Sequence, residues 1–238
     1  MIKRIIRGIV IIFFVLVLGS IVVSEFPQLY VVPFTKYKLS NIPGAYYTFN
    51  LRALEPAQFQ AKNLKEFLAF GYSVVLPWQE SEIIERRNVH AVFFQSGNKQ
   101  LIAFDEEPDI FLLMQGENGI QQEDLVSFYG KDVTKSRYEF YRYILNLTPN
   151  DLKIFAPKRE SLSKSVLVIF KSITVWGEGP FYEFDTNHIR GFQYGNLING
   201  KSFIVDFFTP NDKRFRILFS GIEDQREVDF IINSIRIK

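Results

Sequence analysis

The sequence predicts an α+β protein: an antiparallel β-sheet packed with helices as a layered sandwich, preceded by one N-terminal transmembrane helix. Hairpin signals indicate antiparallel pairing, because a short turn joins neighbouring strands. Helices expected in blocks, rather than after each strand, indicate α+β layering instead of a parallel sheet. A charge-free apolar run near the amino terminus predicts the membrane helix.

The apolar run covers residues 9–23 and follows three cationic residues, Lys3, Arg4 and Arg7. A spanning helix needs about 20 apolar residues and a signal-peptide core about 7–15, so the run lies between the two classes. We predict an uncleaved membrane anchor over residues 1–24, with a cleaved signal peptide as the alternative. The positive-inside rule then places the amino terminus in the cytoplasm and the rest of the chain outside it.

Residues 25–43 are predicted to be a tether, because Pro27, Pro33 and Pro43 break regular structure. No internal repeat or second linker follows. We therefore expect residues 44–238 to form a single extracytoplasmic α+β domain.

The first half of this domain contains clear strand signals. Residues 71–77 form a compact apolar run between Gly and Pro, and residues 89–94 and 100–104 flank a Ser-Gly-Asn turn typical of a hairpin. An aromatic-rich strand is expected over 46–51. Glu55-Pro56 is expected to open a short helix that includes Phe67 and Leu68.

The second half begins with helices, expected over 121–129, at the helical spacing of Tyr138, Tyr141 and Leu145, and over 162–173. The last of these is rich in β-branched residues, so a strand is an alternative. Asn199-Gly200 predicts a hairpin between 189–198 and 202–208. A strand from 214 to 219 and an amphipathic helix carrying Val228, Ile231, Ile232 and Ile235 close the chain.

Composition excludes several classes of function. The 238 residues include no cysteine, which excludes disulfides, thiolate zinc sites, iron–sulfur clusters and thiol catalysis. The chain has 28 basic and 26 acidic residues, which excludes a strongly basic nucleic-acid binder. Without the three cations before the apolar run, 25 basic residues face the same 26 acidic ones, so the expected exported domain is close to neutral.

No catalytic, cofactor-binding or metal-binding motif is evident. Histidine and carboxylates crowd only at Glu183, Asp185 and His188. On a strand, the two acids share a face and are suited to metal ligation or proton transfer. The competing interpretation is a solvated face, because Tyr182 and Phe184 would then take the buried side.

The layout resembles the Mog1/PsbP-like α/β/α sandwich family over about residues 70–238. The resemblance is carried by the early strand GYSVVLP followed by Trp78, a central helical block, and the ending RFRILFSGIEDQREVDFIINSIRI with Ser234-Ile235 near its close. Domains of that family are mostly non-enzymatic accessory or assembly modules. The resemblance therefore implies a similar role here.

These observations favour a single-pass, membrane-anchored extracytoplasmic domain that acts without catalysis, as an interaction or accessory protein. Its expected partners are the membrane and a protein, not nucleic acid. One alternative is a membrane-tethered hydrolase around Asp185 and His188. Another is an apolar-ligand-binding module, motivated by the 16% aromatic content, which predicts a cavity of about 300–1,000 Å³.

Overall fold

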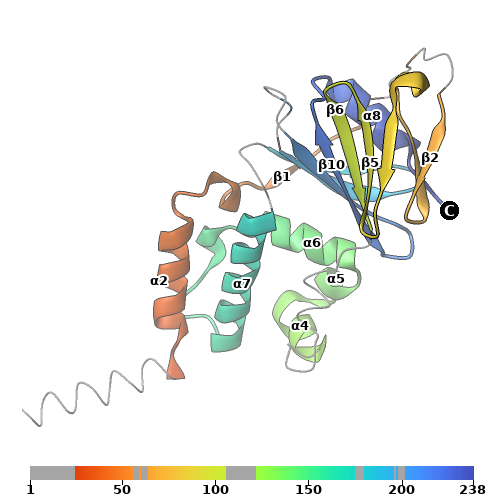
Figure 1. Ribbon diagram of the computed structural model, residues 1–238. Helices are drawn as coiled ribbons and strands as arrows, with labels where there is room; N and C mark the ends of the chain where they lie inside the picture. The colour runs from red at the N-terminus through yellow and green to blue at the C-terminus, as the bar shows by residue number, and fades with distance from the viewer. Residues whose placement is uncertain are drawn as a thin grey trace, which may run out of the picture. The chain divides into compact units, whose positions relative to one another are not determined.

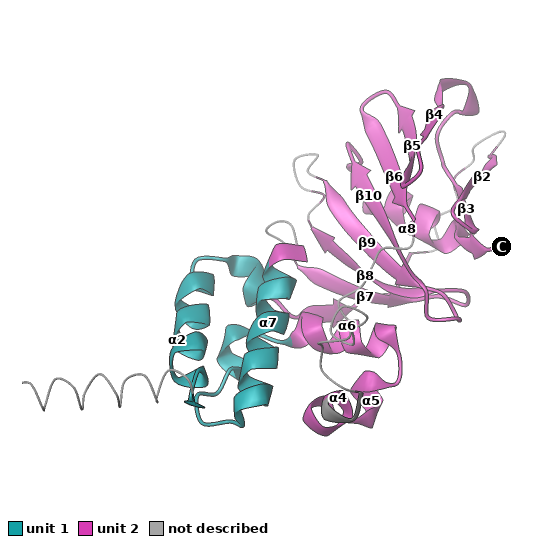
Figure 2. Ribbon diagram, turned by 60° about the horizontal axis from the view of Figure 1, so that its bottom comes forward, with its two compact units in different colours: residues 1–46, 147–172 teal, residues 47–146, 173–238 magenta. Residues whose placement is uncertain are grey.

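The computed structural model describes residues 25–55, 59, 64–105, 122–174, 180–195, 197 and 202–238. The chain divides into two compact units, coloured teal and magenta in Figure 2. Unit 1 comprises residues 1–46 and 147–172, and unit 2 comprises residues 47–146 and 173–238. The fold is α+β, with a large mixed sheet packed against helices (Figure 1).

The large sheet belongs to unit 2, and its described strands follow the order β1-β7-β8-β9-β10-β6-β5-β4. They are β1 (Phe49–Leu51), β4 (Ile84–Arg87), β5 (Ala91–Ser96), β6 (Lys99–Phe104), β7 (Phe181–Asp185), β8 (Arg190–Gly195), β9 (Phe203–Phe208) and β10 (Arg214–Ser220). All neighbours are antiparallel except β1 and β7, which run parallel. The purely antiparallel prediction is wrong at this edge, because β1 pairs with a strand far away in the sequence and no turn signal announces that pairing.

The strand pairing confirms the predicted hairpin of residues 89–94 and 100–104, and it adds one between β9 and β10. β5 and β6 are joined by a turn in which Gly97 has a φ of 58°, a left-handed conformation that glycine adopts without strain. β9 and β10 are joined around Asp212, whose backbone N–H donates to the carbonyl of Thr209. The two strands expected on either side of Asn199-Gly200 pair with each other as β8 and β9. The turn itself lies outside the described residues.

The main core lies between one face of the large sheet, helix α8 (Gln225–Ser234) and a second sheet. The second sheet has the order β11 (Arg236–Ile237), β3 (Tyr72–Val75), β2 (Glu66–Ala69). α8 is the predicted closing helix, and the Asp224 side chain caps it by accepting from the Arg226 backbone N–H. Every second residue of β9, at 203, 205 and 207, joins this core.

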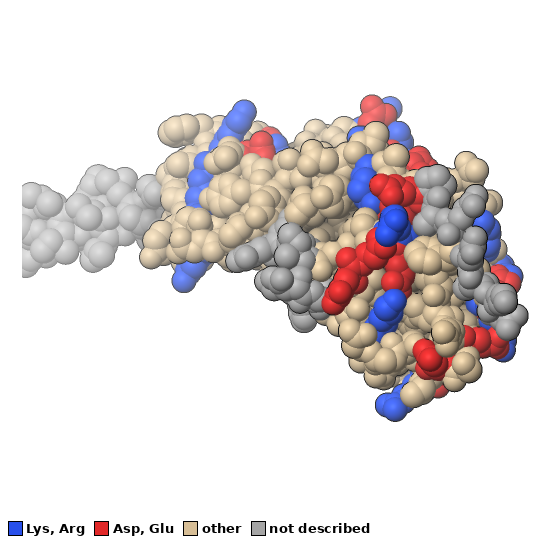
Figure 3. Space-filling view, turned by 90° about the horizontal axis from the view of Figure 1, so that it is seen from above, with Lys and Arg blue, Asp and Glu red and all other residues tan. Residues whose placement is uncertain are grey.

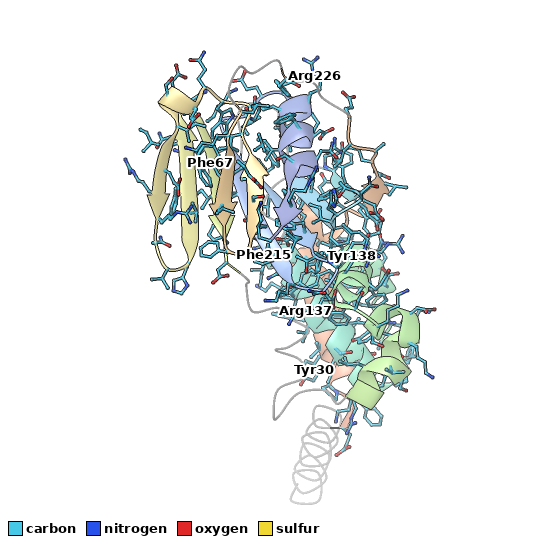
Figure 4. The ribbon with its side chains drawn as sticks, turned by 90° about the vertical axis from the view of Figure 1, so that its right-hand side faces the viewer. Tyr30, Phe67, Arg137, Tyr138, Phe215 and Arg226 are labelled. Atoms are coloured by element: carbon cyan, nitrogen blue, oxygen red, sulfur yellow. The ribbon has the colours of Figure 1, made fainter. Side chains whose placement is uncertain are left out.

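The predicted helix at Phe67 and Leu68 is wrong, because both residues lie in β2. Figure 4 shows Phe67 pointing into the space between the sheets, where its ring packs edge-on against Phe94 with centroids 5.1 Å apart. A strand with one face on an aromatic core partly buries this ring, and β2 also gains backbone hydrogen bonds from β3.

Helices cover only half of the opposite face of the large sheet. Helices α4 (Gln122–Tyr129), α5 (Lys131–Thr134) and α6 (Arg137–Asn146) follow β6 in unit 2, as the helical spacing predicted for α4 and α6. Tyr138 and Tyr141 of α6 pack their rings on Phe208 of β9. The side chains that β4, β5 and β6 place on this face are exposed or half-buried, apart from Ala91.

Unit 1 is helical in its described part. It contains α2 (Gln28–Leu39), all but the last two residues of α7 (Lys158–Thr174), and the short 3-10 turns η1 (Pro43–Ala45) and η3 (Pro149–Asp151). Residues 28–39 are therefore helical where an irregular tether was expected. Pro27 precedes the helix, and only Pro33 lies within it. Val32, Thr35 and Leu39 are buried, and this packing offsets the hydrogen bond that Pro33 removes. The helical interpretation of residues 162–173 is confirmed as α7.

Among the helices that the structure describes, none is long and apolar enough to cross a membrane. The predicted anchor over residues 1–24, with Lys3, Arg4 and Arg7, lies outside the described residues.

Candidate functional site

The uncovered half of the large sheet in unit 2 carries the candidate site. Ile84 and Arg86 of β4 stand opposite Gln95 and Phe93 of β5. Gln95 and Phe93 in turn stand opposite Gln100 and Ile102 of β6. Directly opposed residues point to the same face of a sheet, so these six side chains form one continuous surface.

This surface is hollowed. A depression of about 240 Å³ lies over β4, β5 and β6, lined by Ile84, Arg86, Phe93, Phe94, Gln95, Gln100, Leu101 and Ile102. We call it the β4–β6 hollow. Ile84 is 53% exposed, while Phe93 and Ile102 are half-buried. Its apolar floor is bordered by two amides and one guanidinium, a composition typical of a protein-binding surface.

The two neighbouring arginines of β4 have different roles. Arg87 points to the opposite face, where it pairs with Glu85 and its Nη2 donates to the Leu68 carbonyl at 2.6 Å. Arg86 points to the hollow and has no hydrogen bond or ion pair with any residue that the structure describes. Arg86 therefore offers a free cation at the edge of an apolar surface.

A buried ionic cluster stands on the same sheet face, on strands β8 to β10. Asp206 is 1% exposed and accepts hydrogen bonds from Tyr194 and from Arg216, whose Nε lies 2.8 Å from Oδ1. Arg214 is also buried and lies 3.5 Å from the same carboxylate. The guanidinium of Arg214 stacks over the Tyr141 ring of α6 at 4.7 Å.

Glu183 is buried, which corrects the expectation that the acids of β7 are solvated. Its carboxylate accepts a hydrogen bond from the Tyr138 hydroxyl and one from Arg142 Nε at 2.9 Å. Both donors come from α6, which covers this part of the sheet. Burial raises the pKa of the Tyr138 hydroxyl, and the hydrogen bond to Glu183 raises it further.

Asp185 and His188 are not brought together with Glu183. Asp185 is exposed at the end of β7, and His188 is exposed in the turn that follows. The Thr186 hydroxyl organises this turn by accepting from the backbone N–H groups of His188 and Ile189. No hydrogen bond or ion pair joins these three described residues to one another.

The buried carboxylates of unit 2 are matched by cations. Besides the two described above, Asp229 pairs with Arg52 at 2.8 Å and Glu227 pairs with Lys99 at 2.8 Å. Each of these four carboxylates therefore has a cation that offsets the cost of burying its charge. Within the described ranges, no group of three or more His, Cys, Asp or Glu side chains is placed to hold a metal ion.

Unit 1 contains one buried titratable group of note. Lys171 of α7 is fully buried, and its Nζ donates to the Leu147 carbonyl at 2.7 Å. Burial lowers the pKa of Lys171 from 10.5 to about 8, against a smaller opposing effect of the Asp151 charge.

We expect Lys171 to make stability rise with pH between about 8 and 10.5. In this window the folded chain has released the lysine proton while the unfolded chain still binds it, so raising the pH favours folding. The free energy of unfolding of the wild type should gain up to about 3 kcal/mol relative to Lys171→Met. Urea denaturation of both proteins at pH 7.5, 8.5 and 9.5 measures this difference, and a constant difference would contradict the burial argument.

The fold and these sites define an α+β protein with a half-covered mixed sheet and paired buried charges. No protein-family model and no curated protein matches the chain.

The hollow was missed by the sequence reasoning, although two signals point to it. Residues 91–94 are apolar on both faces of the strand, which indicates that the second face also meets something. Arg86 and Arg87 are adjacent in the sequence, and the alternation of a strand places the two side chains on opposite faces, so one of them faces the second surface.

Proposed function

We propose that this protein is a membrane-anchored, extracytoplasmic interaction protein, an accessory or assembly factor whose β4–β6 hollow binds a partner protein. The observation that carries the proposal is the hollow itself, an exposed apolar surface beside the free guanidinium of Arg86. The layout resemblance to Mog1/PsbP-like sandwiches favours the same class of function.

The chemistry of the hollow indicates what the partner presents. Ile84, Phe93 and Ile102 suit an apolar side chain, and Arg86 suits a carboxylate, with which a guanidinium forms two parallel hydrogen bonds. Gln95 and Gln100 can hydrogen-bond to a backbone. The partner is therefore expected to present an apolar residue close to an acidic one.

Docking on the face of β4 is favoured over the addition of a strand to its edge. β4 is four residues long and three of them, Glu85, Arg86 and Arg87, are charged. Short, charged edge strands are how proteins discourage strand pairing with other chains.

A protein partner is also favoured over a small apolar ligand. The hollow of about 240 Å³ is smaller than the 300–1,000 Å³ of typical ligand pockets, and it is open and partly polar. Its volume suits one or two side chains of a partner.

The membrane part of the proposal is supported by the apolar run at residues 9–23 and by the cations Lys3, Arg4 and Arg7 before it. The cell membrane is the proposed location, with a cytoplasmic amino terminus and both units on the extracytoplasmic side.

A photo-crosslinking residue tests the hollow in the full chain in its native membrane. Benzoylphenylalanine at position 84 should give a discrete adduct, whereas the same residue at Val89, which is 79% exposed in the neighbouring turn, should give none. Arg86→Glu should abolish the adduct because it repels the expected carboxylate, and Lys131→Glu, at an exposed position of α5, should preserve the adduct.

The orientation is tested on the same membranes. Protease added to the extracytoplasmic side of intact membranes should remove the adduct.

The affinity can then be measured with a synthetic peptide copied from the crosslinked segment. Arg86→Glu should weaken binding about tenfold or more, and replacing the acidic residue of the peptide by lysine should restore it. Equal adducts from positions 84 and 89, or binding that ignores Arg86→Glu, would contradict the proposal. Protection of the adduct from protease would contradict the orientation.

A further inference from the structure

The two long helices of unit 1 expose apolar side chains where water-facing helices usually carry polar ones. On α2, the buried positions 28, 32, 35 and 39 follow one helical face. Tyr30, Phe34 and Tyr37 occupy the opposite face and are 47%, 58% and 74% exposed. α2 is thus apolar on both sides, and Figure 4 shows Tyr30 at the surface of this helix.

α7 buries more polar side chains than is usual for a helix. Its buried positions are Ser161, Ser163, Ser165, Leu167, Val168 and Lys171, of which four are polar. Three of its aliphatic side chains, Val166, Ile169 and Ile173, are exposed, with accessibilities of 52%, 38% and 65%. In a helix bordered by water, burying serines and exposing aliphatic side chains forfeits the hydrophobic contribution.

A second, larger hollow lies in unit 1. It measures about 420 Å³ and is lined by Lys36, Leu152, Lys153, Ile154, Phe155 and Ala156. Phe155 is 95% exposed, so its ring projects from the protein surface. Two ammonium groups beside an apolar wall suit a lipid headgroup above its acyl chain.

Unit 1 is also net positive in its described part, with seven basic residues against three acidic ones. The basic residues are Lys36, Lys38, Lys153, Lys158, Arg159, Lys164 and Lys171, and the acidic ones are Glu25, Asp151 and Glu160. In Figure 3 the part at the left, which Figure 2 colours as unit 1, shows mostly uncharged surface with a few basic side chains and fewer acidic ones.

We propose that unit 1 is a membrane-surface module, and that the apolar faces of α2 and α7 with Phe155 insert into the interfacial layer of an anionic bilayer. Tyr and Trp are the side chains favoured at that depth, and lysines extend from it to the headgroups. The inference rests on the proposed anchor. The apolar run ends at residue 23 and α2 begins five residues later at Gln28, so an anchored chain would hold α2 next to the bilayer, which can cover its apolar face.

The absence of cysteine allows a direct test with the full chain. Single cysteines at Phe34, Tyr37 and Val166 are spin-labelled, and Val89→Cys in unit 2 is the matched exposed control. The proteins are reconstituted in vesicles of phosphatidylcholine with or without phosphatidylglycerol. In the anionic vesicles, oxygen accessibility should exceed nickel-chelate accessibility by severalfold at the three unit 1 positions, and the order should be reversed at position 89.

The lysines should control the depth of insertion. Lys36→Glu with Lys153→Glu should raise the nickel accessibility at position 34 severalfold and leave position 89 unchanged. Labels at 34, 37 and 166 that are all water-accessible on a chain that floats with the vesicles would overturn this inference and leave the anchor intact. Low accessibility to both reagents would overturn it in favour of a protein cover, and a chain that fails to float would overturn both proposals.

Discussion

Replacing Asp206 by alanine is expected to lower the free energy of unfolding by about 3–5 kcal/mol. The Asp206 carboxylate is buried among Tyr194, Arg214 and Arg216, and Arg214 is itself only 2% exposed. Without the carboxylate, a buried guanidinium keeps its charge and has lost the counterion that offset its desolvation. Urea denaturation of the full chain, followed by circular dichroism, measures the loss.

Two further variants separate this explanation from a general loss of packing. Glu80→Ala breaks the exposed pair between Glu80 and Lys65, which lie 3.0 Å apart, and should cost less than about 1 kcal/mol. Replacing Asp206 and Arg214 together by leucine and methionine should recover part of the loss, because no buried charge then stands alone at this position. A single-variant loss below about 1 kcal/mol would show that water reaches the cluster.

Gly221→Ala is expected to cost about 3 kcal/mol or more, from strain added to overpacking. Gly221 follows β10 with a φ of 70°, and a Cβ built there would lie 2.0 Å from the Asn98 carbonyl oxygen. That oxygen belongs to the backbone of the β5–β6 turn. The clash with the new Cβ can therefore be relieved only if the β5–β6 hairpin and the end of β10 move apart. Thermal and urea denaturation both measure the effect.

Gly97→Ala is the matched control, one residue away from the atom that Gly221 approaches. Gly97 also has a positive φ, 58°, but a Cβ there meets no atom within 4 Å. Only the backbone strain remains, and the expected loss is about 1–2 kcal/mol. Equal losses for the two variants would mean that the close approach to Asn98 is relieved without cost.

Sequence reasoning succeeded where the signal is local. The β5–β6 hairpin depends on a turn of a few residues, and the amphipathic repeat of α8 lies within ten residues. The pairing of β1 with β7 was not predicted, because its partners are far apart in the chain. Phe67 was assigned to a helix because its strand conformation depends on Phe94, which no local pattern reveals.

The same limit explains the candidate sites. Tyr138 and Arg142, the partners of Glu183, come from a helix about forty residues earlier, and no local pattern around Glu183 indicates them. Arg214 is buried although it is an arginine on a strand that alternates charged and apolar residues, because α6 covers that face and Asp206 neutralises the charge. The apolar residues of α7 repeat at helical spacing in the sequence, but the sequence does not show that several of them are exposed. Periodicity indicates which residues share a helix face, and it does not indicate whether that face packs on protein, water or lipid.

The division of the chain into two units has a practical consequence for any shortened version of this protein. The chain crosses between them after residues 46, 146 and 172, so neither unit is a continuous piece of sequence. A truncation that begins at residue 47 would discard α2 and retain residues 147–172 without the rest of their unit. A fragment that keeps both units is better started at residue 25, and insertions are better kept away from the three crossings.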